Sequence, residues 1–164
     1  MATKETGSND CLLRDGKPAE EHPLWDARLT ETGIDQARRL RQLLATRPSG
    51  GRSFTAFDLV VCSPLTRTLE TAQHVFGRPR TPGTPAFLDE GEAPEGSPER
   101  QFANTAKVPA PRVLVREECR ERWGQYVCDG RRPIREIMPE FPGFDFSELE
   151  HDNDVFYTQA RNGT

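Results

Sequence analysis

The sequence lacks any apolar run long enough to span a bilayer, and no signal-peptide pattern opens it. It also lacks a surplus of positive charge, because the formal net charge is -4. A domain that binds nucleic acid is typically basic on at least one face. We therefore expect a cytoplasmic protein that binds neither nucleic acid nor membranes.

The cysteines lack the spacing of a zinc site or a disulfide framework. The chain has four of them, at Cys11, Cys62, Cys119 and Cys128, and no Cys-x-x-Cys pair occurs. Free, reduced thiols are the expected state for such a pattern in a cytosolic protein. The sequence thus predicts no metal and no other cofactor.

Apolar residues are also somewhat scarce, at 34% of a chain of 164 residues. This length is sufficient for one domain with a hydrophobic core, accompanied by polar, loop-rich segments. We expect an irregular N-terminus over residues 1–23 and a single domain over residues 24–164. Within that domain, residues 77–111 contain seven of the 14 prolines and are expected to be a flexible insertion.

What the chain does contain is an apolar strand pattern that leads directly into a helix. Leu59–Cys62 is rich in β-branched residues, which is typical of a strand covered on both faces. Ser63 can cap the following helix through its hydroxyl, and Pro64 suits its first position. The helix then has one apolar face, formed by Leu65, Leu69, Ala72, Val75 and Phe76.

Two further segments complete the expected layer. Thr30 or Thr32 can start a helix that ends near residue 45, and residues 112–116 form a second short strand. The buried face of the first helix is predicted to contain Ile34, Ala37, Leu40, Leu43 and Leu44. The order of these elements predicts an α/β fold in which the two strands are parallel.

Arg67 is a candidate for binding an anion. Ligands of open α/β sheets gather at the carboxyl ends of strands, and free N–H groups in a helix's first turn favour an anion there. Arg67 lies one turn into such a helix, with Ser63 at the junction, and its guanidinium suits phosphate oxygens. From the residues alone, an ordinary strand-helix junction with a solvated surface arginine is the simpler alternative.

The segment from Ser63 to Ala72 resembles the SPLxRTxxTA element of the histidine phosphatase superfamily, also called the phosphoglycerate mutase-like family. Other segments are similar to a eukaryotic branch of this family and occur in its order. The resemblance covers residues 24–76 and 112–157, and it implies a phosphoglycerate mutase-like three-layer α/β/α sandwich. The segments that carry it, besides 63–72, are residues 25–33, 119–124 and 128–134.

The resemblance also implies a chemistry. Intact members move a phosphoryl group from a phosphate monoester to a histidine, while arginines hold the phosphate and a glutamate protonates the leaving group. It implies that Arg67 and Ser63 bind phosphate and that Glu121, or else Glu118, is the proton donor. The substrate would be a phosphorylated small molecule or a phosphoprotein. Without the resemblance, both glutamates would be ordinary surface carboxylates.

The resemblance suggests roles for two other segments. Arg131 and Arg132 are expected either to help recognise an acidic substrate or to form exposed ion pairs of small energetic value. Residues 141–146 resemble the family segment that folds over the site and closes it.

The chain departs from the family pattern at the nucleophile. The family carries its reactive histidine in an Arg-His-Gly motif, and none of His22, His74 and His151 lies in one. We therefore interpret the chain as a truncated or divergent member with an incomplete sheet. One hypothesis is a phosphatase, which is a hydrolase, or a phosphomutase. The other is an inactive pseudoenzyme that retains weak anion binding or an interaction surface. The substrate and the oligomeric state stay open.

Overall fold

The computed structural model describes residues 18–46, 48–49, 52–53, 57–77, 111–121 and 126–157. Most of the predicted irregular N-terminus and of the predicted insertion at 77–111 lies outside these residues. The described end of the N-terminal segment differs from the expectation of irregular chain, because η1 (Ala19–Glu21) is a turn of 3-10 helix with Ala19 buried. Within the described residues, no helix is both long and apolar enough to cross a membrane.

The centre of the fold is a parallel pair of strands joined through a helix. β3 (Leu59–Cys62) is followed by α2 (Thr66–Phe76), and β4 (Arg112–Val115) then pairs with β3 in parallel. The register places Leu59 beside Arg112 and Cys62 beside Val115. The α/β class and the parallel pairing expected from the sequence are therefore confirmed.

The two strands differ in what lies along their outer edges. The N–H of Val115 donates to the carbonyl of Asp145 at 2.9 Å, and the N–H of Asp145 donates to the carbonyl of Val113 at 2.8 Å. β4 is thus paired on both edges. Among the described residues, β3 pairs with β4 alone.

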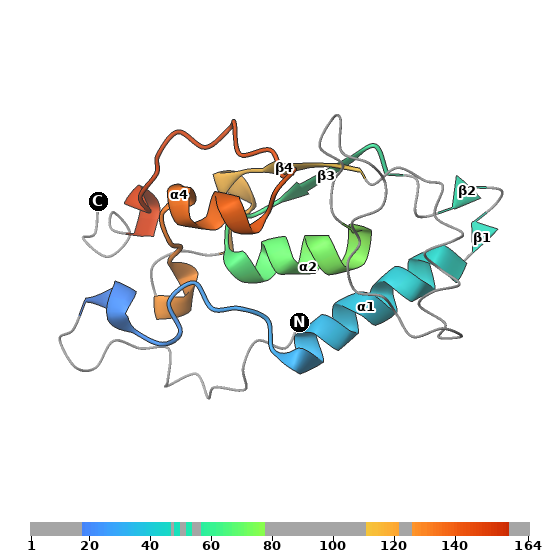
Figure 1. Ribbon diagram of the computed structural model, residues 1–164, viewed down its shortest axis with the longest axis horizontal. Helices are drawn as coiled ribbons and strands as arrows, with labels where there is room; N and C mark the ends of the chain where they lie inside the picture. Colours follow the sequence, from blue (N-terminus) through green and yellow to red (C-terminus); the bar gives the residue numbers. More distant parts are fainter. Residues whose placement is uncertain are drawn as a thin grey trace.

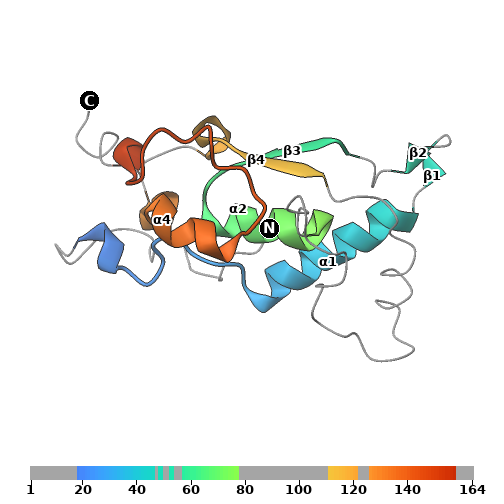
Figure 2. The same cartoon turned by 45° about the horizontal axis from the view of Figure 1, so that its top comes forward.

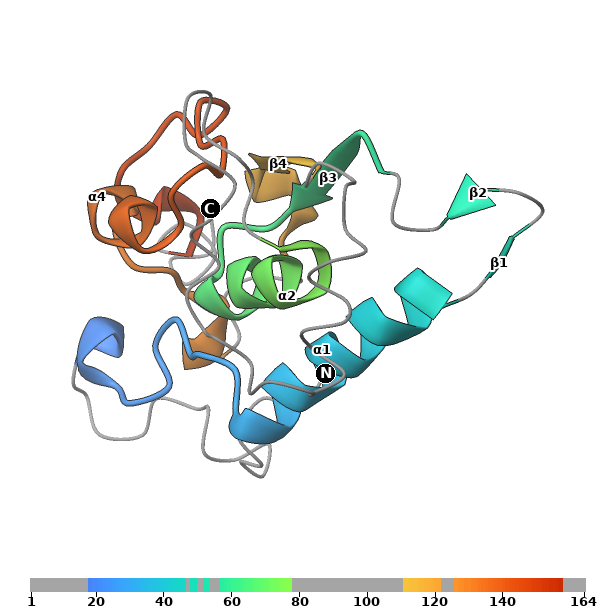
Figure 3. The same ribbon diagram turned by 45° about the vertical axis from the view of Figure 1, so that its right-hand side comes forward.

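Among the described residues, the two long helices lie on one side of the strand pair (Figure 2). α1 (Glu31–Thr46) packs against α2 and begins after Thr30, whose hydroxyl accepts the N–H of Gly33 at 3.1 Å. Beyond α1, the short strands β1 (Pro48–Ser49) and β2 (Arg52–Ser53) pair with each other. They lie away from β3 and β4 (Figures 1 and 3).

The core lies between α2, β4 and the chain that follows β4. α4 (Ile134–Ile137) and η4 (Met138–Glu140) belong to this following chain. The predicted apolar face of α2 is confirmed, since its residues are buried or pack against the core. The core cluster consists of Leu69, Ala72, Val113, Val115, Ile134, Ile137, Phe141, Phe144 and Phe146.

Two predictions of burial are wrong. Only one face of β3 is covered: Val60 and Cys62 pack against the core, whereas Leu59 and Val61 are 47% and 44% exposed. On α1, Ala37 is buried, but Leu40 and Leu43 are exposed. The reason on α1 is geometric, because the second half of this helix extends past the end of α2 (Figure 1).

Candidate functional site

The first turn of α2 follows the carboxyl end of β3, where the sequence predicts an anion site. The helix begins at Thr66, so the prediction that Ser63 caps it and Pro64 opens it is wrong. The Ser63 hydroxyl instead accepts the N–H of Leu65 at 3.2 Å, and its carbonyl accepts the Thr68 hydroxyl at 2.6 Å. Ser63 is buried in this turn.

The cap of α2 comes from a distant residue, Asp26. Its Oδ1 accepts the Thr66 N–H at 2.8 Å, and its Oδ2 accepts the Thr66 hydroxyl at 2.5 Å. A carboxylate is the anion that a helix N-terminus favours. The protein therefore supplies an anion of its own to the N–H group of Thr66. A phosphate at this end of the sheet would have to bind farther along, at Arg67.

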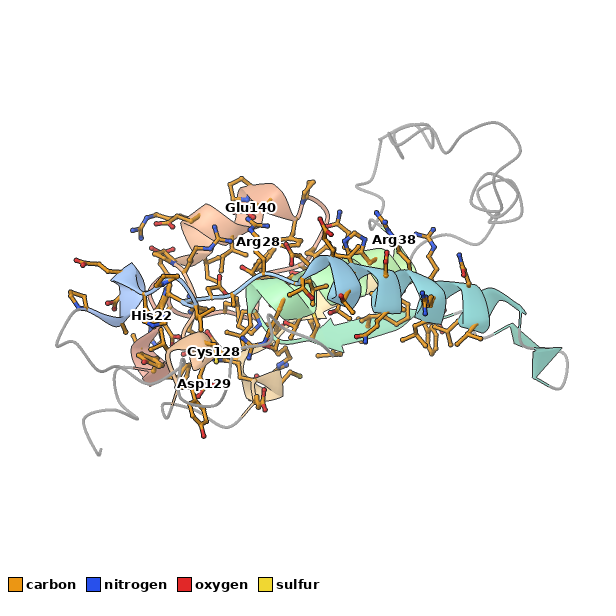
Figure 4. The ribbon with its side chains drawn as sticks, turned by 90° about the horizontal axis from the view of Figure 1, so that it is seen from below. His22, Arg28, Arg38, Cys128, Asp129 and Glu140 are labelled. Atoms are coloured by element: carbon orange, nitrogen blue, oxygen red, sulfur yellow. The ribbon has the colours of Figure 1, made fainter. Side chains whose placement is uncertain are left out.

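Asp26 and Thr66 belong to a wider network of hydrogen bonds and ion pairs. The Nε of Arg132 donates to Asp26 at 3.1 Å, and its Nη1 donates to Glu140 at 2.6 Å. Arg28 bridges the same Glu140 to Glu70 of α2, and Figure 4 shows Arg28 and Glu140 side by side. Because Arg132 and Arg28 stabilise its charged form, the pKa of Glu140 is below its ordinary value.

Arg67 is held between the helix and the chain that follows β4. Its side chain is 12% exposed, so the alternative of a solvated surface arginine is wrong. The Nη1 donates to the carbonyl of Cys128 at 2.6 Å, and the Nη2 lies 3.7 Å from Oε2 of Glu121. One end of the guanidinium is thus fixed by the protein, and the other faces an exposed carboxylate.

The two candidate glutamates occupy different places. Glu121 is 77% exposed and lies beside Arg67. Glu118 instead pairs with Arg116, whose hydrogen bonds lower the pKa of the Glu118 carboxyl. The structure therefore brings Arg67 and Glu121 together at the end of β3, with the Ser63 turn at the start of the same helix.

Sequence reasoning missed a buried carboxyl in this neighbourhood, Asp129. It directly follows Cys128, as labelled in Figure 4, and accepts the Tyr126 N–H at 3.0 Å. Burial raises the pKa of Asp129, while the charges of Arg67 and Glu121 act on it in opposite directions. No sequence signal distinguished this residue from an ordinary turn aspartate.

Arg131 and Arg132 do not form exposed ion pairs, as one sequence hypothesis expected. Arg131 is fully buried, pairs with Glu117 at 2.7 Å, and donates to backbone carbonyls at residues 151–153. These bonds occupy its guanidinium, so the hypothesis that Arg131 recognises a substrate is also wrong. Arg132 is occupied in the same way by Asp26 and Glu140.

Residues 141–146 also lie elsewhere than the resemblance implied. Phe141, Phe144 and Phe146 are buried in the core. Asp145, between them, pairs along the outer edge of β4. The segment therefore covers a strand edge and completes the core.

Two of the histidines, His22 and His74, lie within elements of the fold. The Nδ1 of His22 accepts the N–H of Leu24 at 3.1 Å, which closes a turn. His74 is half-buried in the last turn of α2, and burial lowers its pKa. In the part of the chain that the structure describes, no three His, Cys, Asp or Glu side chains gather in a way that could hold a metal ion.

Comparisons with known proteins point to one family. Residues 11–91 match the sequence profile described as the histidine phosphatase superfamily (branch 1). Two Arabidopsis thaliana proteins, a phosphoglycerate mutase-like protein and phosphoglycerate mutase-like protein 1, are 34% and 36% identical over 81% and 83% of this chain. A third, phosphoglycerate mutase-like protein 2, is 28% identical over 82% of it.

These relatives are longer than the chain described here. The matches cover 47%, 46% and 45% of the three Arabidopsis proteins, so the chain spans about half their length. No solved structure matches. The comparisons do not favour the alternative of an inactive, truncated form. The sequence elements around Arg67, the α/β fold and these relatives agree, and the chain belongs to the histidine phosphatase superfamily.

Proposed function

We propose that this chain forms the phosphate-binding arm of a site for phosphate monoesters, in a phosphatase or phosphomutase. Arg67 would hold the phosphate oxygens, with Ser63 beside it, and Glu121 would give a proton to the leaving alcohol oxygen. The observation that carries the proposal is the 3.7 Å approach of exposed Glu121 to the largely buried side chain of Arg67 at the carboxyl end of β3. The substrate would be a phosphorylated small molecule or a phosphoprotein.

The geometry supports this division of roles. The Nη1 of Arg67 is bound to the Cys128 carbonyl, which fixes the plane of the guanidinium. The Nη2 faces Glu121, whose side chain is exposed and can move to admit a phosphate oxygen. A fixed cationic donor stabilises charge on a phosphoryl group, and a nearby carboxylic acid can protonate the departing oxygen.

The covalent step is not assigned to any residue of this chain. None of its three histidines follows an arginine or precedes a glycine. We expect no phosphohistidine on this chain after incubation with a labelled phosphate monoester. Acid-labile, base-stable label that disappears in His74→Ala would contradict this expectation and identify His74 as the nucleophile.

The test of the phosphate arm is a titration with inorganic phosphate followed by NMR. Binding with a dissociation constant of about 1 mM is expected, because a single arginine with few additional donors gives a standard free energy of about -4 kcal/mol. The amides of residues 63–67 should shift first, and Arg67→Ala should abolish the shift. Arg38→Ala is the matched control, since Arg38 is exposed on α1 (Figure 4). If Arg67→Ala responds as the parent does, the proposed site is wrong.

A further inference from the structure

Asp26 combines full burial with an unfavourable backbone conformation. Its side chain is completely buried, and its φ of 46° makes it the one described non-glycine residue with a positive φ. This conformation is costly for a residue with a Cβ, and it persists only where the surroundings fix it. Aspartate tolerates it better than most residues do. Its contacts show what fixes it.

The carboxylate of Asp26 joins two segments that are far apart in sequence. It accepts the N–H and the hydroxyl of Thr66, at 2.8 and 2.5 Å, in the first turn of α2. It also accepts the Nε of Arg132 at 3.1 Å. Arg132 in turn donates from Nη2 to the Thr66 hydroxyl at 3.0 Å, so these side chains form a closed ring.

These two segments are the ones that hold Arg67. Its backbone follows Thr66 directly, and its guanidinium is bound to the carbonyl of Cys128, four residues before Arg132. Asp26 therefore ties the helix turn from which Arg67 extends to the segment that holds its guanidinium.

The neighbour of Asp26 packs against the same segment. A Cβ added to Gly130 would lie 2.0 Å from Cζ3 of Trp25, so the indole ring lies directly against this glycine. Trp25 is fixed from another side by an edge-on contact with Tyr157, with ring centroids 4.9 Å apart. The Trp25-Asp26 dipeptide thus holds residues 128–132 by packing as well as by hydrogen bonds.

We propose that Asp26 is a positioning residue for the phosphate arm, which holds Arg67 in its binding orientation by joining Thr66 to Arg132. The inference rests on the proposed function, because it assigns Asp26 a role at that site. The residue does not touch the phosphate. It acts through Thr66 and through the segment that carries the Cys128 carbonyl.

The test compares Asp26→Asn with Asp35→Asn, an exposed aspartate on α1 that serves as the matched control. Asparagine tolerates positive φ, so Asp26→Asn removes the charge and one acceptor without new backbone strain. Two quantities are measured in the full chain, well below its unfolding temperature. They are the heteronuclear NOE of the Arg67 Nε–H group without ligand and the dissociation constant for inorganic phosphate.

We expect Asp26→Asn to lower the NOE of Arg67 and to weaken phosphate binding about tenfold, because small displacements of a binding group are costly. Asp35→Asn should change neither quantity. If Asp26→Asn does not fold, Thr66→Val decides the question, since it removes the hydroxyl from the ring and keeps the helix N–H bonded to Asp26.

The outcomes separate this inference from the proposed function. If phosphate binds through Arg67, and the folded Asp26 or Thr66 variant keeps the parent NOE and affinity, Asp26 has no positioning role and the phosphate arm stands. If the parent does not bind phosphate, the proposed function fails. In that case the heteronuclear NOE of the Arg67 Nε–H group alone decides whether Asp26 restricts the motion of the Arg67 side chain.

Discussion

β3 and β4 are neighbouring strands that both turn alternate residues towards the core, but their core-facing residues are buried to different degrees. In β4, Val113 and Val115 are fully buried, and both strand edges are paired. In β3, Val60 and Cys62 lie on the same core-facing side but are only partly buried, and only one edge has a partner among the described residues. The difference arises from the chain that follows β4, which folds back along its outer edge and fills the core beside it.

This comparison shows that the burial of a strand depends on which other segments of the chain pack against it. An apolar, β-branched sequence indicates that a strand can be buried, but not which segment buries it. The segment that covers β4 is itself fastened by buried ion pairs, above all between Arg120 and Asp154, whose side chains are 1% and 3% exposed. Breaking the Arg120–Asp154 pair should therefore have the largest effect on stability.

Asp154→Ala should destabilise the protein by about 3 kcal/mol, because Arg120 stays charged and buried and keeps, among the described residues, only Glu117 as a carboxylate partner, at 3.1 Å. Arg120 now donates to both carboxylate oxygens of Asp154 at 2.8 Å. The free energy of unfolding from urea denaturation measures the loss. The control is Glu118→Ala, which removes an exposed pair with Arg116 and should cost less than about 1 kcal/mol. Equal losses would mean that the Asp154 pair does not fasten the cover of β4.

The valines of the two strands provide the next comparison. Val113→Ala removes two methyl groups from a fully buried side chain and should cost about 2 kcal/mol. Val61→Ala makes the same chemical change at an exposed position and should cost less than about 0.5 kcal/mol. Denaturation curves of both variants decide this. A large loss at Val61 would show that its face of β3 is covered in solution.

The edge contact of β4 should give a signature at low pH. The Ser147 hydroxyl, together with Arg112 on β4, lowers the pKa of Asp145 from 3.8 to about 2. A lowered folded-state pKa stabilises the protein above the unfolded value, and this contribution is lost as the pH falls from about 4 towards 2. Asp145→Asn should therefore make the loss of stability over this range shallower. An unchanged slope of unfolding free energy against pH would exclude the coupling.

The prediction with the smallest effect on stability concerns the thiol of Cys62, on the covered face of β3. Burial raises the pKa of Cys62 to about 12, whereas Cys119 is exposed. Since the thiolate is the reactive form, iodoacetamide at pH 8 should modify Cys62 more than about a hundredfold more slowly than Cys119. Peptide mass spectrometry after timed quenching measures both rates. Comparable rates would show that this face of β3 opens readily.

Local sequence patterns were sufficient to predict the elements that are determined by the spacing of apolar residues along the chain. The apolar spacing of α2 and the strand character of residues 112–116 were sufficient for the β-α-β unit. The position of Arg67 one turn after a strand placed it at the carboxyl end of β3. Glu121 was chosen from the resemblance, and the structure places it beside Arg67.

The remaining features depend on contacts between distant parts of the chain. Asp26 caps a helix that begins 40 residues later, so the spacing of Ser63 and Pro64 misplaced its start. Arg131 is buried because carbonyl groups about 20 residues later surround its guanidinium. Neither the apolar periodicity of the sequence nor its turn residues indicate the Asp26 cap or the burial of Arg131. The exposure of Leu59 was missed for the same reason.

The most direct measurement of the central claim is the phosphate affinity of the parent, Arg67→Ala, Glu121→Gln and the double variant. Glu121 lies 3.7 Å from Arg67, so its charge competes with phosphate for the guanidinium. We predict that Glu121→Gln binds inorganic phosphate a few-fold more tightly, consistent with roughly 0.5–1 kcal/mol for a partly exposed charge pair. Arg67→Ala and the double variant should not bind it. Unchanged affinity in both single variants would contradict the assignment of Arg67 and Glu121 to a phosphate site.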